Sequence, residues 1–357
     1  MDDTEKMLKE LTEVTGISGY EAEVRSSMKK YLAPFGKISY DNLGSLVCAK
    51  TGDSDSPKVM LAAHMDECGF MVQQITKEGC IKFTRIGGWW EHVLLAQRVR
   101  IHTVKGDVIG VIGAKPPHLL MEEERKKIVE KKDMYIDIGA TTQEEAEASG
   151  VRIGDPIVPE SDFAVLANGK SYLGKAFDDR VCCAMIVSTM QKLSGQNHPN
   201  TVYGVATVQE EVGLRGGRTS VNVVRPDVAL VLDTGIATDI PGMTEPVYKL
   251  TWGPVAGFVE PGMITNLKLR DLVIDVAKKN DIPVQIIADN DARYGTDADV
   301  IHVYKSGVPS IMIGPPVRHI HSHTSICHRT DYDLCVDLLV ALIKELDGKT
   351  VASFTEW

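Results

Sequence analysis

Two adjacent glutamates, Glu210 and Glu211, stand in the stretch "TVQEEVGLRGG", where an apolar run ends and three glycines follow. The preceding segment, "TVYGVATV", is rich in β-branched residues and predicts a buried strand, whereas the glycines predict an irregular turn. An adjacent pair of glutamates is most often simply solvated. Carboxylates just past the carboxyl end of a strand, however, lie where open α/β sheets build their sites. The doublet is therefore a candidate for metal binding or proton transfer.

Four further stretches place metal-binding residue types at predicted strand-to-loop edges. These stretches are "AAHMDE", "GKAFDDR", "VLDTG" and "RHIHSHT", and they contribute His64, Asp66, Glu67, Asp178, Asp179, Asp233, His319, His321 and His323. A single histidine or aspartate at such a place is more often a hydrogen-bonded structural residue. Five segments at the edges of one sheet can converge, and their combination predicts one common site.

The residue types in these segments indicate the chemistry of that site. Carboxylates and imidazoles without a thiolate favour divalent zinc, cobalt or manganese held for catalysis, because structural zinc sites usually recruit cysteines. The number of ligands suggests two ions, and a shared aspartate can bridge two ions about 3.5 to 4 Å apart. A carboxylate that is not a ligand could then take a proton from the bridging water. One glutamate of the doublet would bind metal and its neighbour would be the base, and spacing alone does not assign the two roles.

Alternating strands and helices must position these residues. Helices are expected over residues 2–15, 21–33, 178–193, 266–280, 297–307 and 331–348, and strands over residues 58–67, 201–209, 228–235, 284–288 and 309–314, with a hairpin over 38–52. Between residues 67 and 162 the pattern changes to short β-type runs separated by glycines. The predicted fold is an α/β sandwich made of residues 1–66 and 163–357, with a small β-barrel-like domain inserted at residues 67–162.

Composition limits the classes of function. The chain has 357 residues, is 43% hydrophobic and carries a formal net charge of -10. An acidic chain without a basic face opposes binding to nucleic acid or to an anionic membrane. The amino terminus lacks an apolar signal-peptide core and no run of about 18 apolar residues occurs, so a cytoplasmic location is expected. The seven cysteines have no framework spacing and are expected to be reduced thiols.

Nearly the whole chain resembles the M42 metallopeptidases, the glutamyl aminopeptidase and tetrahedral aminopeptidase group, some members of which were labelled endoglucanases. The stretches that carry the resemblance occur in order: "TGISGYEAEVR", "HMDECGF", "GVIGAKPPHLL", "YIDIGATTQEEAEASGVRIGD", "GKAFDDR", "QEEVGLRGG", "LDTG", "GTDAD" and "HIHSHT". The resemblance implies a metallo-aminopeptidase that hydrolyses the first peptide bond of short peptides with a free amino terminus. It also implies a homo-oligomer, a dodecamer built from dimers, in which the inserted segment is the dimerisation domain.

The resemblance also implies roles for particular residues. One metal ion would be held by His64, Asp178 and Asp233, and the other by the bridging Asp178 with Glu211 and His321. Glu210 would be the general base, and Asp66 would orient the ring of His64. The two divalent ions would be zinc or cobalt, and the peptide bond between Asp178 and Asp179 would be cis. Four histidines lie within ten residues of one another, and His323 or His319 is the alternative to His321.

Two other functions are weighed against the aminopeptidase. A glycosidase of the endoglucanase type needs two carboxyl groups flanking a sugar and gains nothing from five metal-type ligands. A non-catalytic, metal-dependent scaffold would be expected to have lost one of the ligands or Glu210, and all are present. The "HSHT" variant resembles glutamyl-type members of the family more than leucyl-type ones, and this resemblance implies acidic first residues in the substrate, with large apolar ones next.

Overall fold

A mixed β-sheet forms the centre of the larger part of the protein in the computed structural model, which describes residues 1–243, 247–289 and 294–356. Within these residues the sheet has nine strands in the order β1-β2-β12-β3-β13-β18-β15-β16, with β17 paired to β15. Strands β12, β3, β13 and β18 run parallel, while β2 and β15 join this block antiparallel. The bounds are β1 Lys37–Tyr40, β2 Leu46–Thr51, β3 Lys58–His64, β12 Thr201–Thr207, β13 Val228–Leu232, β15 Val255–Glu260, β16 Met263–Ile264, β17 Gln285–Ala288 and β18 Ser310–Gly314.

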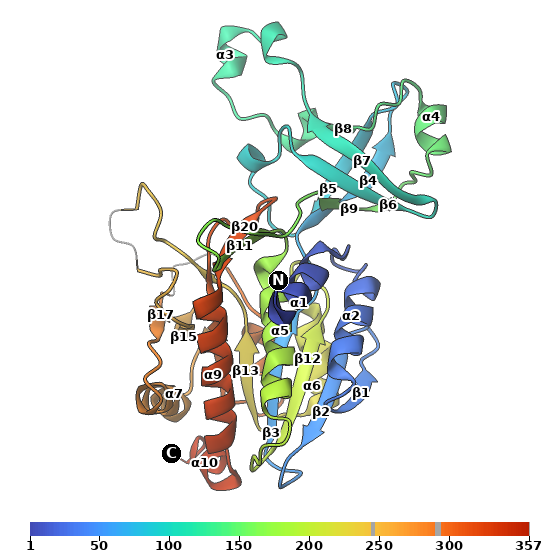
Figure 1. Cartoon of the computed structure of the whole chain (residues 1–357). Coiled ribbons are helices and arrows are strands. Elements are labelled where there is room, and N and C mark those ends of the chain that lie inside the picture. The colour runs from blue at the N-terminus through green and yellow to red at the C-terminus, as the bar shows by residue number, and fades with distance from the viewer. Residues whose placement is uncertain (244–246, 290–293, 357) are drawn as a thin grey trace.

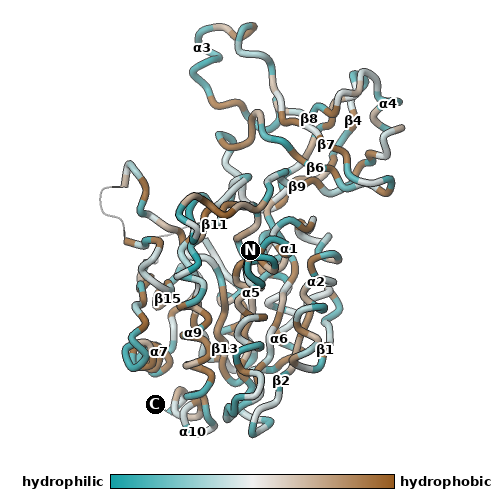
Figure 2. The backbone as a smooth tube through the Cα atoms, viewed as in Figure 1, coloured by the Kyte–Doolittle hydropathy of each residue, from teal (hydrophilic) through white to brown (hydrophobic). Residues whose placement is uncertain are grey.

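Helices cover both faces of this sheet, because its central strands are apolar on both sides. Along β3, Leu61 belongs to the core beneath one helical layer, whereas Met60 and Ala62 belong to the core beneath the other. Hydrophobic residues accordingly recur along the central strands and the inner sides of the helices (Figure 2). The first layer holds α1 Asp3–Glu13, α2 Ala22–Leu32, α5 Phe177–Lys192, α7 Leu267–Lys279, α9 Arg329–Glu345 and α10 Gly348–Ser353; the second holds α6 Arg215–Val224 and α8 Ala298–Ile301.

The inserted segment forms a closed barrel that stands above the α/β part (Figure 1). Its six strands are β4 Gly69–Ile75, β5 Ile81–Ile86, β6 Arg98–Thr103, β7 Gly106–Gly113, β8 Tyr135–Asp137 and β9 Pro156–Pro159. The barrel has its own apolar core, in which Phe70 stacks on Trp89 at 4.7 Å and meets Phe83 edge-on at 5.1 Å between ring centroids. Two short helices lie outside it, α3 Glu122–Arg125 and α4 Gln143–Ala148.

Short β pairings surround the place where the barrel joins the α/β part. Strands β10 Ala164–Val165, β11 Ser171–Gly174 and β20 Ser325–His328 form a three-stranded sheet, and β14 Gly235–Ile236 pairs with β19 Pro316–Val317. Three single turns of 3-10 helix lie in the insert, at Glu91–Val93, Pro117–Leu119 and Lys131–Asp133. The chain therefore leaves the sheet after β3, builds the barrel, and returns through β10 and β11 to α5.

A buried ionic cluster lies at the same junction. The Glu67 carboxylate accepts hydrogen bonds from Lys175 Nζ at 2.6 Å and from Arg180 Nη2 at 2.9 Å, and all three side chains are at most 3% exposed. The Arg180 guanidinium also donates to four backbone carbonyls, those of Leu11, Val14, Gly16 and Met65. Breaking such a buried pair typically costs about 3–5 kcal/mol, because one charge is left without a partner. The cluster ties the first loop, the exit of β3 and the start of α5 together.

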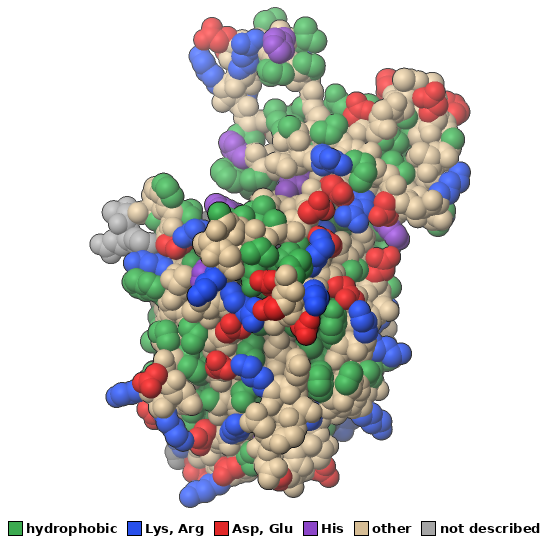
Figure 3. Space-filling model, viewed as in Figure 1, with side chains coloured by type: hydrophobic (Ala, Val, Ile, Leu, Met, Phe, Trp, Pro, Cys, Tyr) green, Lys and Arg blue, Asp and Glu red, His purple; other side chains and the backbone are tan. Residues whose placement is uncertain are grey.

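The structure confirms the α/β sandwich with an inserted barrel that the sequence predicts. The helix expected over residues 297–307 is shorter, since α8 ends at Ile301. Beyond it the backbone forms turns, with Lys305 at a φ of 52° and Gly307 at 102°, and the amide of Val308 bonds back to the carbonyl of His302. None of the helices in the described ranges combines the length and the apolarity that crossing a membrane would require. On the face shown in Figure 3, acidic and basic side chains are interspersed over the α/β part.

Candidate metal centre

Strand ends, one helix start and the loop between β19 and β20, which carries His321, bring the predicted ligands to a single cavity of about 480 Å³. His64 is the last residue of β3, the glutamate doublet follows β12, and Asp233 follows β13. Asp178 comes from the first turn of α5, where the backbone is not helical, and the peptide bond between Asp178 and Asp179 is cis. The described residues that line the cavity include all five predicted ligands and the predicted base: His64, Asp178, Glu211, Asp233 and His321, with Glu210.

His64, Asp178 and Asp233 form the first group of facing donors. Their ligand atoms lie within 4.8 Å of one another, and His64 Nε2 is 3.2 Å from Asp178 Oδ1. The other ring nitrogen, Nδ1, is 2.9 Å from the backbone carbonyl oxygen of Asp66. That carbonyl can accept only from a protonated Nδ1, so Nε2 is the ring atom that faces the carboxylates and would offer its lone pair to a bound ion.

His321, Asp178 and Glu211 form the second group. His321 Nε2 is 3.3 Å from Asp178 Oδ2 and 3.8 Å from Glu211 Oε1. His321 has a φ of 53°, and its Nδ1 lies 2.8 Å from the carbonyl oxygen of Gly88, in the barrel segment. The two oxygens of Asp178 thus face two different histidines, one in each group.

Glu210 lies beside the first group, with Oε2 3.8 Å from His64 Nε2. Burial, and then the repulsion of carboxylates such as Asp233, raises the pKa of the Glu210 carboxyl well above its usual range. Burial likewise raises the pKa of Asp233 well above normal, with Asp178 as the main repelling neighbour. These acids therefore resist ionising together unless positive charge is brought among them.

Divalent cations fit this donor set. Two imidazole nitrogens and several carboxylate oxygens, buried and facing one cavity, match the ligands that catalytic zinc and cobalt sites use. The carboxylates outnumber the basic side chains, since the described residues that line the cavity include no lysine or arginine. A cation of charge two would offset the repulsion that the pKa values of Glu210 and Asp233 reflect. The residues present could hold one metal ion in each group.

Asp66 holds the backbone of the glutamate doublet. Its Oδ1 accepts from the amide of Glu210 at 3.0 Å, and its Oδ2 accepts from the amide of Glu211 at 3.1 Å and from Ser18 Oγ at 2.6 Å. The Asp66 carboxylate is farther, 3.6 Å, from His64 Nδ1. The side chain that was expected to orient His64 therefore acts mainly on the two glutamates, and the Asp66 backbone carbonyl contacts the ring.

Glu21 fixes the residue before the doublet. Its Oε1 accepts from the amide of Gln209 at 3.0 Å, where Gln209 has a φ of 55°. The left-handed conformation is uncommon for a residue other than glycine, so this hydrogen bond helps to hold an unfavourable turn. Sequence reasoning did not identify Glu21 or Ser18, because both lie near the amino terminus and far along the chain from the residues that they contact.

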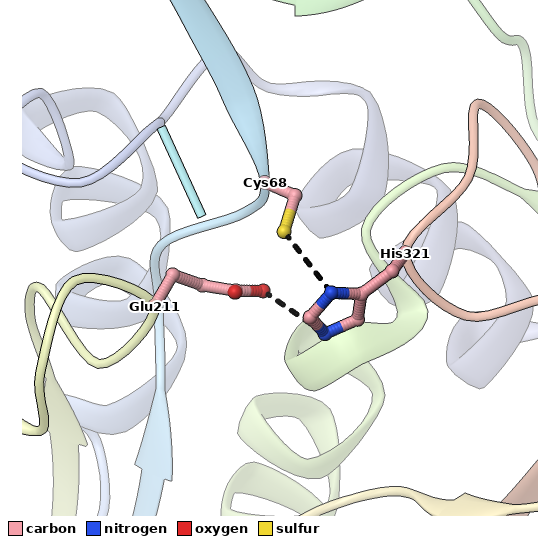
Figure 4. A group of neighbouring side chains, drawn as sticks. All are labelled: Cys68, Glu211 and His321. Carbon is pink, nitrogen blue, oxygen red and sulfur yellow. Dashed lines mark hydrogen bonds and ion pairs between the residues drawn. The ribbon is translucent and has the colours of Figure 1, made fainter. Parts of the chain in front are cut away.

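A thiol stands beside the second group, where the sequence analysis expected none. Cys68 Sγ is 3.6 Å from His321 Nδ1, and donor atoms of Cys68, Glu211 and His321 lie within 4.8 Å of one another (Figure 4). Burial, together with the adjacent Glu211 carboxylate, raises the pKa of the Cys68 thiol well above its usual range. The only signal in the sequence was its position directly after Glu67 in "HMDECGF".

The remaining candidates lie elsewhere. Glu67 belongs to the buried ionic cluster, and Asp179 Oδ2 accepts from the backbone amide of His64 at 3.1 Å. His319 is outside the lining of the metal-ligand cavity. His323 is buried against Trp89, at 5.3 Å between centroids, with neither ring nitrogen hydrogen-bonded, and burial lowers its pKa to about 4. Of these three histidines, only His321 faces the carboxylates.

Comparison with known proteins gives one consistent set of relatives. The sequence model of the family described as M42 glutamyl aminopeptidase matches residues 44–338. The lysyl aminopeptidase of Pyrococcus furiosus is 34% identical, over 96% of this chain and 97% of its own. The crystal structure of a TET aminopeptidase from a marine sediment thaumarchaeon is 48% identical, with a TM-score of 0.96 over 99% of this chain and 100% of that chain. The TET1 peptidase of Pyrococcus horikoshii is 32% identical, with a TM-score of 0.86 over 96% and 100% of the two chains.

The contacts of Asp66 predict its effect on metal binding. In Asp66→Asn one of the two acceptor oxygens becomes an amide that cannot accept, so one glutamate amide loses its partner. The affinity for zinc or cobalt should fall by roughly 10- to 100-fold, as for other changes next to metal ligands. Competition with a chromophoric chelator measures the affinity of each variant for the metal ion. Asp55→Asn, in an exposed loop, is the matched control, and equal affinities of both variants and the native protein would contradict the prediction.

Proposed function

The chain belongs to the M42 glutamyl aminopeptidase family, and on that premise we propose a two-metal aminopeptidase in which Glu210 is the general base. His64, Asp178 and Asp233 would hold one divalent ion, and Asp178, Glu211 and His321 the other. The observation that carries this proposal is the position of Asp178, whose two carboxylate oxygens face His64 at 3.2 Å and His321 at 3.3 Å. A carboxylate placed between two ligand groups is the arrangement that a paired metal centre needs.

When bound, the two ions would polarise the scissile carbonyl and lower the pKa of the attacking water. Glu210 lies in the cavity, and its carboxylate also comes within 4.8 Å of donor atoms of His64 and Glu211. In the proposed assignment it binds neither ion, and its carboxylate would take a proton from that water. The water oxygen forms the new bond to the carbonyl carbon and the carbon–nitrogen bond breaks. Glu210 then returns the proton to the departing amine. The products are one free amino acid and a peptide shorter by one residue.

The proposed substrates are short peptides with a free amino terminus. The described residues that line the cavity include several carboxylates and no lysine or arginine, and carboxylates attract the α-ammonium group by charge. An amine anchored at a fixed place restricts cleavage to the first peptide bond. The alternatives have less support: two carboxylates would suffice for a glycosidase, and a scaffold without chemistry has no need of a base beside the ligands.

Exchange of Glu210 for glutamine tests the base. Glu210→Gln should keep both metal ions and the fold, while turnover should fall by roughly 10² to 10⁴, the usual contribution of a general base. Glu211→Gln is the matched variant, one residue away, and should lose metal instead. Metal content by elemental analysis is measured beside turnover. A Glu210→Gln protein with near-normal turnover, or a reversed pattern of metal loss, would refute the assignment.

The reaction itself is tested on a peptide ladder with and without an amino-terminal acetyl cap. Residues should be released singly and in order from the free peptide. The capped peptide should be spared, because acetylation removes both the charge and the lone pair of the amine. Chelator should abolish activity, and cobalt or zinc should restore it. Mass spectrometry that shows internal cuts, or equal trimming of the capped peptide, would exclude an aminopeptidase; reducing ends released from a β-glucan would support the glycosidase.

The proposal extends to assembly, with residues 67–162 as the dimerisation unit and residues 1–66 and 163–357 as the catalytic unit. The related TET1 peptidase of Pyrococcus horikoshii can assemble into a tetrahedron or a large octahedral shell. The inserted segment also exposes large apolar side chains, including Trp90 at 62% and Leu119 at 69%, and such surface commonly marks a protein contact.

A homo-oligomer, a dodecamer built from dimers, is therefore expected in solution. Sedimentation velocity at micromolar concentrations should show a large particle. Trp90→Ser should weaken it, because an exposed apolar side chain would no longer be buried between subunits, whereas Trp252→Ser, on the α/β part and 51% exposed, serves as the comparison. A native protein that sediments only as a monomer would contradict the proposal.

A further inference from the structure

Beyond the metal ligands, the cavity has a second wall that is mostly apolar. Its described lining there includes Ile236, Tyr248, Ile287, Tyr294 and Met312. Ile287 and Met312 come from β17 and β18 of the sheet that positions the ligands, whereas Ile236 comes from β14, which pairs with β19 in a separate small sheet. If the first peptide bond lies at the metal centre, this wall is where the side chain of the first residue fits. An apolar wall suits a long aliphatic stem.

Behind this wall, several hydrogen-bond acceptors have no donor. Glu260 ends β15, is only 1% exposed, and neither of its carboxylate oxygens has a hydrogen-bond partner. The Oδ1 atom of Asp299 and the hydroxyl of Tyr294 are also buried without a partner. Since buried polar atoms are almost always paired, three neighbouring groups with unpaired atoms need an explanation.

The backbone links these groups to the cavity. Val259, next to Glu260, pairs with Ala288, and its carbonyl accepts from the amide of Asp289, which lines the cavity, at 3.0 Å. Gly295 also lines the cavity, and a Cβ built on it would lie 2.8 Å from Asp299 Oδ2. Among the described residues, Gly295 therefore brings the cavity wall close to Asp299, and Val259 connects Glu260 to the cavity-lining residue Asp289.

Glycines make room around both carboxyl groups. A Cβ on Gly257 would lie 2.5 Å from Glu260 Oε2, and a Cβ on Gly262 would lie 2.1 Å from Asp299 Oδ2. Both distances are shorter than any real contact, so the backbone at these positions accommodates the acids closely. Burial, and then the repulsion of Asp299, raises the pKa of Glu260 to about 8. The chain thus encloses two mutually repelling acids; Asp299 has a backbone hydrogen bond at Thr296, whereas neither oxygen of Glu260 has a donor.

A ligand group that carries a positive charge and several hydrogen-bond donors would offset the unfavourable burial of these carboxyl groups. A buried carboxylate without a partner is unfavourable, and an ammonium offers three donors and no acceptor, while a guanidinium offers five. An acidic side chain would do the opposite, because it would add a third carboxylate beside Glu260, which has no donor. The chemistry of this region therefore opposes the acidic first residues that the family resemblance favoured.

We propose that the cavity selects peptides whose first residue is lysine or arginine, with the aliphatic stem along Ile287 and Met312 and the cationic end received by Glu260, Asp299 and the Tyr294 hydroxyl. This inference rests on the proposed function, which places the first residue in this cavity. Both Glu260 oxygens are enclosed in the structure, so the ring of Tyr294 turns aside to admit the cation. Glu260 is then a specificity residue and takes no part in the hydrolysis.

The experiment compares p-nitroanilides of lysine, arginine, norleucine, leucine and glutamate on the metal-loaded protein. Norleucine has the stem of lysine without the charge. The value of kcat/KM should be roughly 10- to 100-fold higher for lysine than for norleucine, the effect of a hydrogen bond to a charged group, and lowest for glutamate. In Glu260→Gln the lysine value should fall by a similar factor while the norleucine value stays unchanged. Glu144→Gln, on the exposed surface of α4, should change neither.

Equal kcat/KM values for lysine and norleucine in the native protein would overturn the proposal. An equal loss of kcat/KM for both substrates in Glu260→Gln would also overturn it, because it would indicate a purely structural role of Glu260. If Glu260→Gln does not fold, Asp299→Asn gives the same comparison. If no anilide is cleaved, the proposed function is refuted. The specificity is then tested by calorimetry of lysinamide and norleucinamide binding to the Glu210→Gln protein. Equal affinities for the two amides would refute the specificity. Cleavage of leucine and norleucine without a preference for lysine refutes the specificity alone.

Discussion

The crowding of like charges in one buried cavity is the constraint on which the rest of the structure depends. Asp178, Glu210, Glu211 and Asp233 all line the same space, and each would be driven from it by its neighbours if its backbone were free to move. The fold prevents this displacement because the backbone of each residue is held by a neighbouring strand or helix. The residues follow strands of one sheet or begin a helix that packs on it, and Asp66 binds the two amides of the doublet at 3.0 and 3.1 Å. The repulsion that remains is what makes the cavity attract cations, whether metal ions or the amine of a peptide.

The sequence predicted the composition of this centre because strand ends follow a simple geometric rule. The carboxyl ends of neighbouring parallel strands share one edge, so "AAHMDE", "QEEVG" and "VLDTG" converge in any sheet that holds those strands adjacent, as β3, β12 and β13 are. The choice between His321 and His323 could not be made in that way. It depends on a left-handed backbone at His321 and on a carbonyl of Gly88, some 230 residues earlier in the chain. Contacts between such distant segments have no local pattern.

Other features escaped prediction for related reasons. The pattern of "DADVIHVYKSG" is helical in period, but the turn at Lys305 and Gly307 ends the helix at Ile301, because tertiary packing overrides a short periodic run. Glu260 stands at the end of the apolar segment "VAGFVE", where a charged residue ordinarily marks the solvent. Only the structure shows that it is enclosed at 1% exposure. Cys68 was missed because the five segments with metal-binding residue types indicated a site without a thiolate, and a free cysteine is usually a small core residue.

The cluster of Glu67, Lys175 and Arg180 has a consequence for how the protein is made. Arg180 binds carbonyls of residues 11–16, yet the whole barrel, from Gly69 to Pro159, is synthesised between them. A chain emerges from the ribosome amino terminus first, so the apolar face of helix α1 stays exposed until α5 has been synthesised. The barrel has a core of its own, and the residues that form this core are all synthesised before α5. The inserted barrel can therefore fold first. Helix α1, although it is synthesised earlier, gains its packing against α5 only later.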